Sequence, residues 1–175
     1  MVTAANRPLV VLVGPPGSGK TTVGRALSAR LGAPLHDTDA AIEAGAGKSI
    51  SDIFVDDGEP AFRDLERAEV ARVLAEETGV VALGGGAVMD PQTEAALAGQ
   101  VVVFLDVAIA DASKRIGFDR SRPLLTVNPR ASWVAMMNAR RATYERVATH
   151  RVDTAGREPA DIAEQIAGLL EAARA

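Results

Sequence analysis

A glycine-rich segment near the N-terminus carries the residue types that bind phosphate groups. Residues 14–21 read GPPGSGKT and satisfy the pattern G-x-x-x-x-G-K-[ST]. The segment follows an apolar run at residues 9–13 and precedes a helical periodicity at residues 22–31. Backbone N–H groups of such a loop wrap a phosphate, Lys20 reaches the β- and γ-phosphates, and the Thr21 hydroxyl coordinates Mg²⁺. The flanking strand and helix favour a nucleotide-binding P-loop over a chance glycine-rich turn.

Two more clusters follow later apolar runs. The sequence Asp-Thr-Asp at residues 37–39 follows residues 35–36, and three glycines at 84–86 follow residues 80–83. Because the carboxyl ends of parallel strands lie at one edge of a sheet, both clusters should border the same crevice as the P-loop. The two carboxylates suit Mg²⁺ binding and acceptance of a hydroxyl proton, or they cap the following helix. The glycines form an ordinary turn or present backbone N–H groups to a ligand.

Arginines at three positions are candidates for binding an anionic group. Arg63 and Glu66 lie three apart on a predicted helix over residues 61–77, and Arg140 and Arg141 lie on a later predicted helix. In each case the arginine is either a solvated surface charge or a fork aimed at a carboxylate. The residues alone leave both interpretations open.

The order of elements predicts how these groups are positioned. Apolar strand-like runs at 9–13, 35–36, 80–83, 101–105 and 151–153 alternate with helical stretches, which indicates an α/β fold with a parallel sheet covered by helices. A length of 175 residues fits one domain. Residues 117–130 are polar, contain two prolines and lack periodicity, so they form either a functional lid or a disordered loop.

Composition excludes several classes of function. A net charge of −4 and 3% aromatic residues argue against nucleic-acid binding. The absence of cysteine excludes disulfides, thiolate catalysis and iron–sulfur clusters, and two histidines are too few for a histidine-rich metal site. There is no apolar run of membrane-spanning length, no basic leader and no N-K-x-D motif of a GTPase. We therefore expect a cytoplasmic monomer with no membrane partner.

The motifs, taken in order, resemble those of the bacterial shikimate kinases. Besides the P-loop, the shared elements are D-T-D at 37–39, F-R-x-x-E at 62–66, L-G-G-G-A at 83–87, R-P-L-L at 122–125 and R-x-x-x-Y at 140–144. The P-loop occurs in many families, whereas the ordered set is specific. The resemblance extends from residue 9 to about residue 157 and implies a nucleoside-monophosphate-kinase-like P-loop NTPase fold. That fold is a three-layer α/β sandwich with a five-stranded parallel sheet and a mobile lid.

The resemblance also implies an activity and a domain plan. The family transfers the γ-phosphate of ATP to the 3-hydroxyl of shikimate, in the route to chorismate and the aromatic amino acids. Residues 1–175 would form one domain, with the P-loop at 14–21, a shikimate-binding region at about 37–66 and the lid at about 117–130.

Residue roles carried over from the family fall into four groups. The catalytic group is Lys20, Asp39 as the candidate base, and Arg122 on the lid. The ATP-binding group is Gly17, Ser18, Gly19, Lys20, Thr21, Thr22, Arg115, Arg122 and Arg157. The shikimate-binding group is Asp39, Arg63, Gly84, Gly85, Gly86 and Arg140, with Glu66 orienting Arg63. Thr21 and, through water, Asp37 would hold Mg²⁺. Lys114 is an alternative to Arg115, and Arg141 is an alternative to Arg140.

Two other functions compete with this interpretation. A gluconate kinase would also need the P-loop, but the pair Arg63 and Arg140 and the glycine triplet favour a carboxylated cyclic triol. A degenerate P-loop protein that binds nucleotide as a regulatory module would be expected to have lost Lys20, Asp39 or the lid arginine, and all are present. His36, His150 and Trp133 are expected only to pack.

Overall fold

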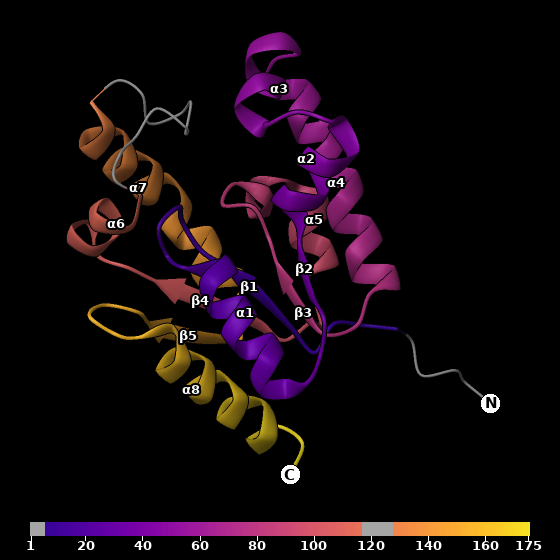
Figure 1. The fold of residues 1–175 in the computed structure, drawn as a ribbon, viewed down its shortest axis with the longest axis vertical. Helices are drawn as coiled ribbons and strands as arrows, with labels where there is room; N and C mark the ends of the chain where they lie inside the picture. Colours follow the sequence, from indigo (N-terminus) through magenta and orange to yellow (C-terminus); the bar gives the residue numbers. More distant parts are fainter. Residues whose placement is uncertain (1–5, 117–127) are drawn as a thin grey trace.

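A five-stranded parallel sheet organises the chain. The computed structural model describes residues 6–116 and 128–175. The strands are β1 (Val10–Val13), β2 (Leu35–Asp37), β3 (Val80–Ala82), β4 (Val102–Asp106) and β5 (His150–Asp153). All pair in parallel in the order β2-β3-β1-β4-β5 (Figure 1). The predicted parallel sheet is confirmed, and β2 extends to the first aspartate of the D-T-D motif.

Helices connect the strands and cover both faces of the sheet. They are α1 (Lys20–Leu31), α2 (Thr38–Ala46), α3 (Ile50–Asp56), α4 (Glu59–Glu76), α5 (Pro91–Ala96), α6 (Ile109–Ile116), α7 (Pro129–Val147) and α8 (Pro159–Ala172), with a short 3₁₀ turn, η1 (Ala87–Met89). No helix within residues 6–116 and 128–175 combines the length and apolar character that crossing a membrane requires.

The two faces of the sheet build two separate cores. Successive strand residues point to opposite faces. Val10 and Leu12 therefore pack with α1 and α8, whereas Val11 and Val13 pack with α4 and α7. Every residue of β1 and β4 is buried, as expected for strands covered on both sides. The three-layer sandwich is confirmed (Figure 1).

A small lobe of helices projects beyond the sheet edge. In Figure 1, α2, α3 and the start of α4 lie at the top of the molecule, away from α8. Their contact is a third apolar cluster of Ile42, Ile53 and Phe62, which is separate from the two sheet cores. Ser49 caps α3 by accepting from the Asp52 N–H at 3.0 Å. This lobe forms one wall of a cavity of about 620 Å³ that lies between the lobe and α7.

Most of the predicted lid at residues 117–130 lies outside the described residues, and Arg122 lies there too. The described chain resumes at Asn128, which caps α7 through its side chain and has a φ of 43°. The last residues of the predicted range therefore begin α7.

One buried carboxylate joins β4, β5 and α7. Asp106 is 6% exposed and lies at the end of β4. Its oxygens accept from Arg141 at 3.1 and 3.2 Å and from the Arg151 Nη2 at 2.6 Å. Burial raises the pKa of Asp106, but the hydrogen bonds from Arg141 and Arg151 outweigh it and hold that pKa below the ordinary 3.8. The network thus fixes the angle of α7 against the sheet.

We predict that Asp106→Asn lowers the free energy of unfolding by about 1–3 kcal/mol at pH 7, because two arginines lose their shared anion. A carboxyl whose pKa is lowered on folding stabilises above its unfolded pKa and stops doing so as the pH falls through the folded value. The difference from wild type should therefore persist down to about pH 4 and shrink below it. Urea unfolding across pH 3–7 measures this, with Asp64→Asn, an exposed residue, as the control. An equal difference at pH 3 and pH 7 would contradict the assignment.

Candidate active site

Two cavities open at the carboxyl edge of the sheet and share a wall. The first, of about 450 Å³, lies over the P-loop and reaches Arg157. The second, of about 620 Å³, lies between the α2–α4 lobe and α7. Both are lined by Pro16, Thr21, Asp37, Asp39 and Gly85. A group bound in one cavity therefore faces a group bound in the other across these residues.

The P-loop presents backbone donors to the first cavity. Gly17 and Gly19 have φ values of 82° and 89°, a left-handed conformation that favours glycine. Gly19 is the N-cap residue of α1, and no side chain caps the helix there. The first N–H groups of α1 and the positive end of its dipole are therefore available to a ligand in the cavity. All six P-loop residues predicted to bind ATP line the cavity: Gly17, Ser18, Gly19, Lys20, Thr21 and Thr22.

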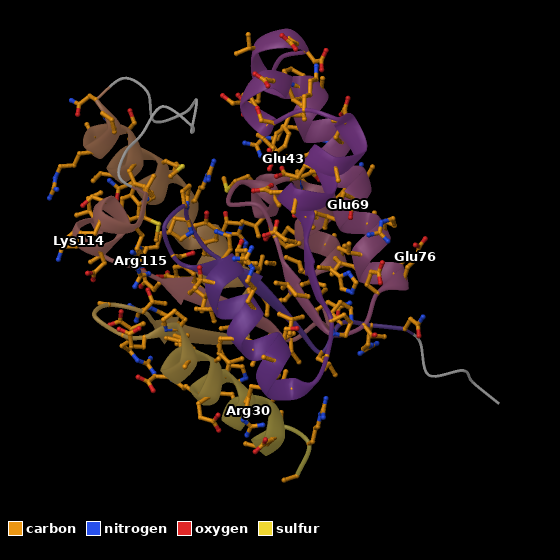
Figure 2. All side chains as sticks on the ribbon, viewed as in Figure 1. Arg30, Glu43, Glu69, Glu76, Lys114 and Arg115 are labelled. Atoms are coloured by element: carbon orange, nitrogen blue, oxygen red, sulfur yellow. The ribbon has the colours of Figure 1, made fainter. Side chains whose placement is uncertain are left out.

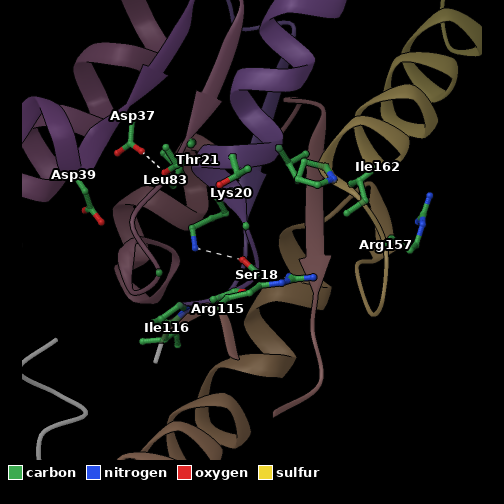
Figure 3. Close-up of a pocket in the computed structure, with 18 residues that line it drawn as sticks. Ser18, Lys20, Thr21, Asp37, Asp39, Leu83, Arg115, Ile116, Arg157 and Ile162 are labelled. Carbon is green, nitrogen blue, oxygen red and sulfur yellow. Dashed lines mark hydrogen bonds between the residues drawn. The ribbon is translucent and has the colours of Figure 1, made fainter. Parts of the chain in front are cut away.

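Lys20 holds its ammonium group over this loop. Its Nζ donates to the carbonyl oxygens of Gly14 at 2.8 Å and Pro15 at 3.1 Å. Figure 3 shows the side chain directed into the cavity, on the same side as Asp39. The Lys20 ammonium group and the uncapped N–H groups at the start of α1 together make this an anion-binding site.

Thr21 and Asp37 form a pair of oxygen donors at the boundary of the two cavities. The Thr21 hydroxyl donates to Asp37 Oδ2 at 2.6 Å (Figure 3). Asp37 Oδ1 accepts from the Ala40 N–H at 3.1 Å, so the carboxylate caps α2 and contacts the P-loop at once. The described residues contain no cluster of three or more metal-ligating side chains. A hydroxyl and one carboxylate nevertheless fit Mg²⁺, which keeps several waters and binds substrate phosphates.

Two arginines line the far end of the first cavity. Arg115 on α6 donates to the Gly17 carbonyl at 3.1 Å and to the Thr154 carbonyl at 2.9 Å, which ties the P-loop to the β5–α8 connection. Arg157 donates to the Asp153 carbonyl at 2.9 Å. Lys114, the alternative to Arg115, is exposed, lies at the outer edge of α6 in Figure 2 and does not line the cavity.

Two guanidinium groups meet in the second cavity. Arg63 Nη1 donates to Glu66 Oε1 at 2.7 Å, and its Nη2 donates to Glu59 at 3.3 Å. Arg140, from α7, is 9% exposed and lines the same cavity. A Cβ at Gly86 would come within 2.7 Å of Arg63 Nη1 and 3.0 Å of Arg140 Nη2, so both guanidinium groups lie over this glycine.

Glycine is needed at positions 84–86 because a side chain would collide with neighbouring groups, not because the backbone angles require glycine. None of the three has a positive φ. A Cβ at Gly84 would lie 2.6 Å from Asp39 Oδ1 and 2.8 Å from Glu66 Oε2. The N–H of Gly84 donates to the buried Thr38 hydroxyl at 3.1 Å, and Gly84 does not line the second cavity. Gly85 and Gly86 do line it, and Gly84 makes room for the carboxylates of Asp39 and Glu66, so its contact with a ligand stays a prediction.

The structure separates the two neighbouring arginines on α7. Arg140 lines the second cavity, whereas Arg141 is bound to Asp106. Adjacent residues of a helix point to different sides, and the pairing of Arg141 with Asp106 agrees with the choice of Arg140 for the cavity.

Sequence reasoning missed two residues that contact the site's backbone. The Trp133 indole donates to the Pro16 carbonyl at 2.9 Å, and the Tyr144 hydroxyl donates to the Gly85 carbonyl at 2.5 Å. Trp133 packs, as predicted, at 3% exposure, but its N–H is also engaged. The signal available in the sequence was spacing, since both share a helix face with Arg140.

Glu66 is a buried carboxylate between two arginines, and its pKa is shifted. It is 3% exposed, and burial raises the pKa of its carboxyl above 4.5 despite the opposing charges of Arg63 and Arg140. The ionised form is therefore held in the site at a cost in folding free energy, and it neutralises part of the positive charge around the second cavity.

Comparisons with known proteins agree on one family. A family model described as shikimate kinase matches residues 16–171. A shikimate kinase of Thermobifida fusca is 57% identical over 169 residues, covering 97% of this chain and 98% of the relative. A shikimate kinase of Salinispora arenicola is 56% identical over 94% of this chain and 99% of its own length. The solved structure of shikimate kinase from Acinetobacter baumannii in complex with shikimate has a TM-score of 0.91 at 33% identity, covering 95% of this chain and 94% of that one.

We predict that the free energy of unfolding of wild type falls relative to that of Glu66→Gln as the pH rises from about 4.5 to about 7.5. A carboxyl whose pKa is raised on folding stabilises below its unfolded pKa, and the benefit is lost as the pH rises through the folded value. Urea unfolding of both proteins at the two pH values measures the effect. Asp106→Asn is the control, since its difference from wild type should stay constant over this range. A relative gain by wild type would show that pairing with Arg63 outweighs burial.

Proposed function

The chain belongs to the shikimate kinase family and transfers the γ-phosphate of ATP to the 3-hydroxyl of shikimate, and we propose that its two joined cavities divide this work. The observation that supports the division is their common wall of Pro16, Thr21, Asp37, Asp39 and Gly85. ATP would occupy the first cavity and shikimate the second, with the transferred phosphate beside that wall.

The first cavity would bind ATP through its phosphates. The uncapped start of α1 and the Lys20 ammonium supply donors and positive charge for the β- and γ-phosphates. Arg115 and Arg157, at the far end, would flank the adenine. Arg122 lies outside the described residues, and its role at the transferred phosphate stays a prediction.

The second cavity would bind shikimate through charge and hydroxyl contacts. Arg63 and Arg140 provide two forks for its carboxylate, and Glu66 fixes the orientation of Arg63. Asp39, at the common wall, would accept hydrogen bonds from the shikimate hydroxyls. Gly85 and Gly86 would offer backbone atoms at close range.

Alignment and charge would supply most of the rate. Phosphoryl transfer passes through a loose transition state, so catalysis depends on holding the hydroxyl in line and neutralising charge on the phosphate oxygens. Asp39, which lines both cavities, would accept the hydroxyl proton. We propose that Thr21 and, through water, Asp37 would hold Mg²⁺, which would supply positive charge against the phosphates.

We propose that the protein acts as a cytoplasmic monomer without nucleic-acid or membrane partners. One chain supplies both cavities. The large apolar side chains exposed among the described residues are scattered over four elements: Val55, Leu65, Met89 and Val134. A net charge of −4 opposes contact with nucleic acid.

The test of the function is ADP release with Mg·ATP in the presence of shikimate, of gluconate, or of neither. Turnover should depend on shikimate and stay at background with gluconate. Turnover with gluconate alone would refute the proposed acceptor, and tight ATP binding without any turnover would refute the enzyme.

We predict that Asp39→Asn lowers kcat by about 10²–10⁴-fold, because the amide cannot accept the hydroxyl proton. The P-loop is untouched, so the affinity for ATP should stay within about threefold of wild type. Steady-state kinetics and nucleotide titration measure both quantities. Asp64→Asn, at an exposed position, controls for the loss of a surface charge. A kcat near wild type in Asp39→Asn would exclude the proposed role.

Arg140→Ala and Arg141→Ala should differ in kind. We predict that Arg140→Ala weakens shikimate binding by about 2–5 kcal/mol, since a desolvated charge pair is lost. Arg141→Ala should lower the melting temperature through Asp106 and leave the shikimate KM unchanged. Kinetics and thermal melts of the two variants decide the matter, and exchanged phenotypes would reverse the assignment.

A further inference from the structure

Helix α7 presents one buried stripe of side chains to the carboxyl edge of the sheet. Trp133, Met137, Arg140 and Tyr144 stand at i, i+4, i+7 and i+11, which places them on the same face of a helix. They are 3%, 3%, 9% and 0% exposed. A single rigid element therefore contacts the site at both ends of this stripe.

The N-terminal end of the stripe contacts the P-loop. The Trp133 indole N–H donates to the Pro16 carbonyl at 2.9 Å, and Pro16 lines both cavities. An indole has only this one donor, and it is normally engaged when the ring is buried. The contact fixes the distance between the P-loop and the N-terminal end of α7.

The C-terminal end of the stripe contacts the glycine loop. The Tyr144 hydroxyl donates to the Gly85 carbonyl at 2.5 Å, and its ring stacks on Phe104 of β4 with centroids 5.1 Å apart. Burial raises the pKa of Tyr144, so the hydroxyl keeps its proton and remains a donor. The Gly85 loop is thus fixed to the same helix.

The two loops also touch each other. A Cβ at Gly85 would come within 3.2 Å of Pro16 Cδ and 3.4 Å of Arg140 Nη1. The P-loop belongs to the proposed ATP cavity and the glycine loop to the proposed shikimate cavity. Their separation sets how far apart the γ-phosphate and the acceptor hydroxyl lie.

We propose that Trp133 and Tyr144 are positioning residues that hold the P-loop and the glycine loop to α7 and so set the distance over which the phosphoryl group is transferred. This rests on the proposed division of ATP and shikimate between the two cavities. Neither side chain is a lining residue of either cavity. Trp133 acts through the backbone of the P-loop, whereas Tyr144 acts through the backbone of the glycine loop and through Arg140, whose guanidinium group also bonds its hydroxyl.

The experiment compares Trp133→Phe and Tyr144→Phe, which remove one donor each and keep an aromatic ring. The control is Met137→Leu, on the same stripe, with a volume-conserving change and no donor. For each variant, kcat, both KM values, the dissociation constant of shikimate and the melting temperature are measured. A displacement of about 1 Å between reacting groups is enough to cost up to about 100-fold in rate.

We expect opposite patterns from the two aromatic variants. Trp133→Phe should lower kcat about tenfold and raise the KM for ATP, with the dissociation constant of shikimate unchanged. Tyr144→Phe should lower kcat similarly and raise the KM for shikimate, with that for ATP unchanged. Met137→Leu should keep wild-type kinetics. If all three variants lose only melting temperature, or if both aromatic variants change the two KM values alike, the proposal is overturned.

Intrinsic fluorescence provides a second test that needs no variant. Trp133 is the only tryptophan in the chain, so emission reports its contact with the P-loop. A non-hydrolysable ATP analogue brings phosphate charge to the loop that the indole N–H binds, so it should shift the emission of wild type. Constant emission at saturation would show that the indole does not sense this loop and would overturn the proposal. Wild type without shikimate-dependent turnover would instead refute the proposed function, which separates the two failures.

Discussion

Two guanidinium groups, one buried and one half-buried, lie over the same glycine in this protein, and the second cavity depends on making that arrangement stable. Arg63 and Arg140 both lie over Gly86, and like charges at this distance repel strongly when water is excluded. Glu66, 3% exposed and bonded to Arg63, supplies one compensating charge. Glu59, half-exposed, is a second anion on Arg63 at 3.3 Å, and Asp39 lines the same cavity. A bound carboxylate would therefore be held by the directed N–H groups of the two guanidinium forks more than by an excess of positive charge.

In the first cavity, where we propose that ATP binds, backbone N–H groups and one lysine supply the groups that bind an anion. The N-terminus of α1 has no side-chain cap, and Lys20 is held on the carbonyl oxygens of Gly14 and Pro15. Donors and a cation are therefore in place before any phosphate arrives, so little reorganisation is needed when it binds. Thr21 and Asp37 lie where the two cavities meet, and they are the oxygen donors that we propose for a divalent cation.

Local features of the chain were predictable, and features that depend on distant partners were not. The strands and the P-loop follow from short patterns, and the Arg63–Glu66 pair follows from helical spacing. The choice of Arg140 over Arg141 follows from the R-x-x-x-Y spacing, whereas the ion pair of Arg141 with Asp106 on β4 could not be predicted from the sequence. The need for glycine at positions 84 and 86 is steric and appears only when side chains from other helices are present. Tyr144 belongs to the R-x-x-x-Y motif, but its hydrogen bond and that of Trp133 end on backbone carbonyls, so the sequence does not identify their partners.

The lobe of α2, α3 and the start of α4 has an apolar cluster of its own, built on Ile42, Ile53 and Phe62. Such a cluster makes a cooperative unit that can open without breaking the cores on the two faces of the sheet. The lobe lines the second cavity and joins the P-loop mainly through Asp37, the N-cap of α2. Substitutions in its apolar cluster are therefore expected to change what the second cavity accepts before they change the binding of phosphate.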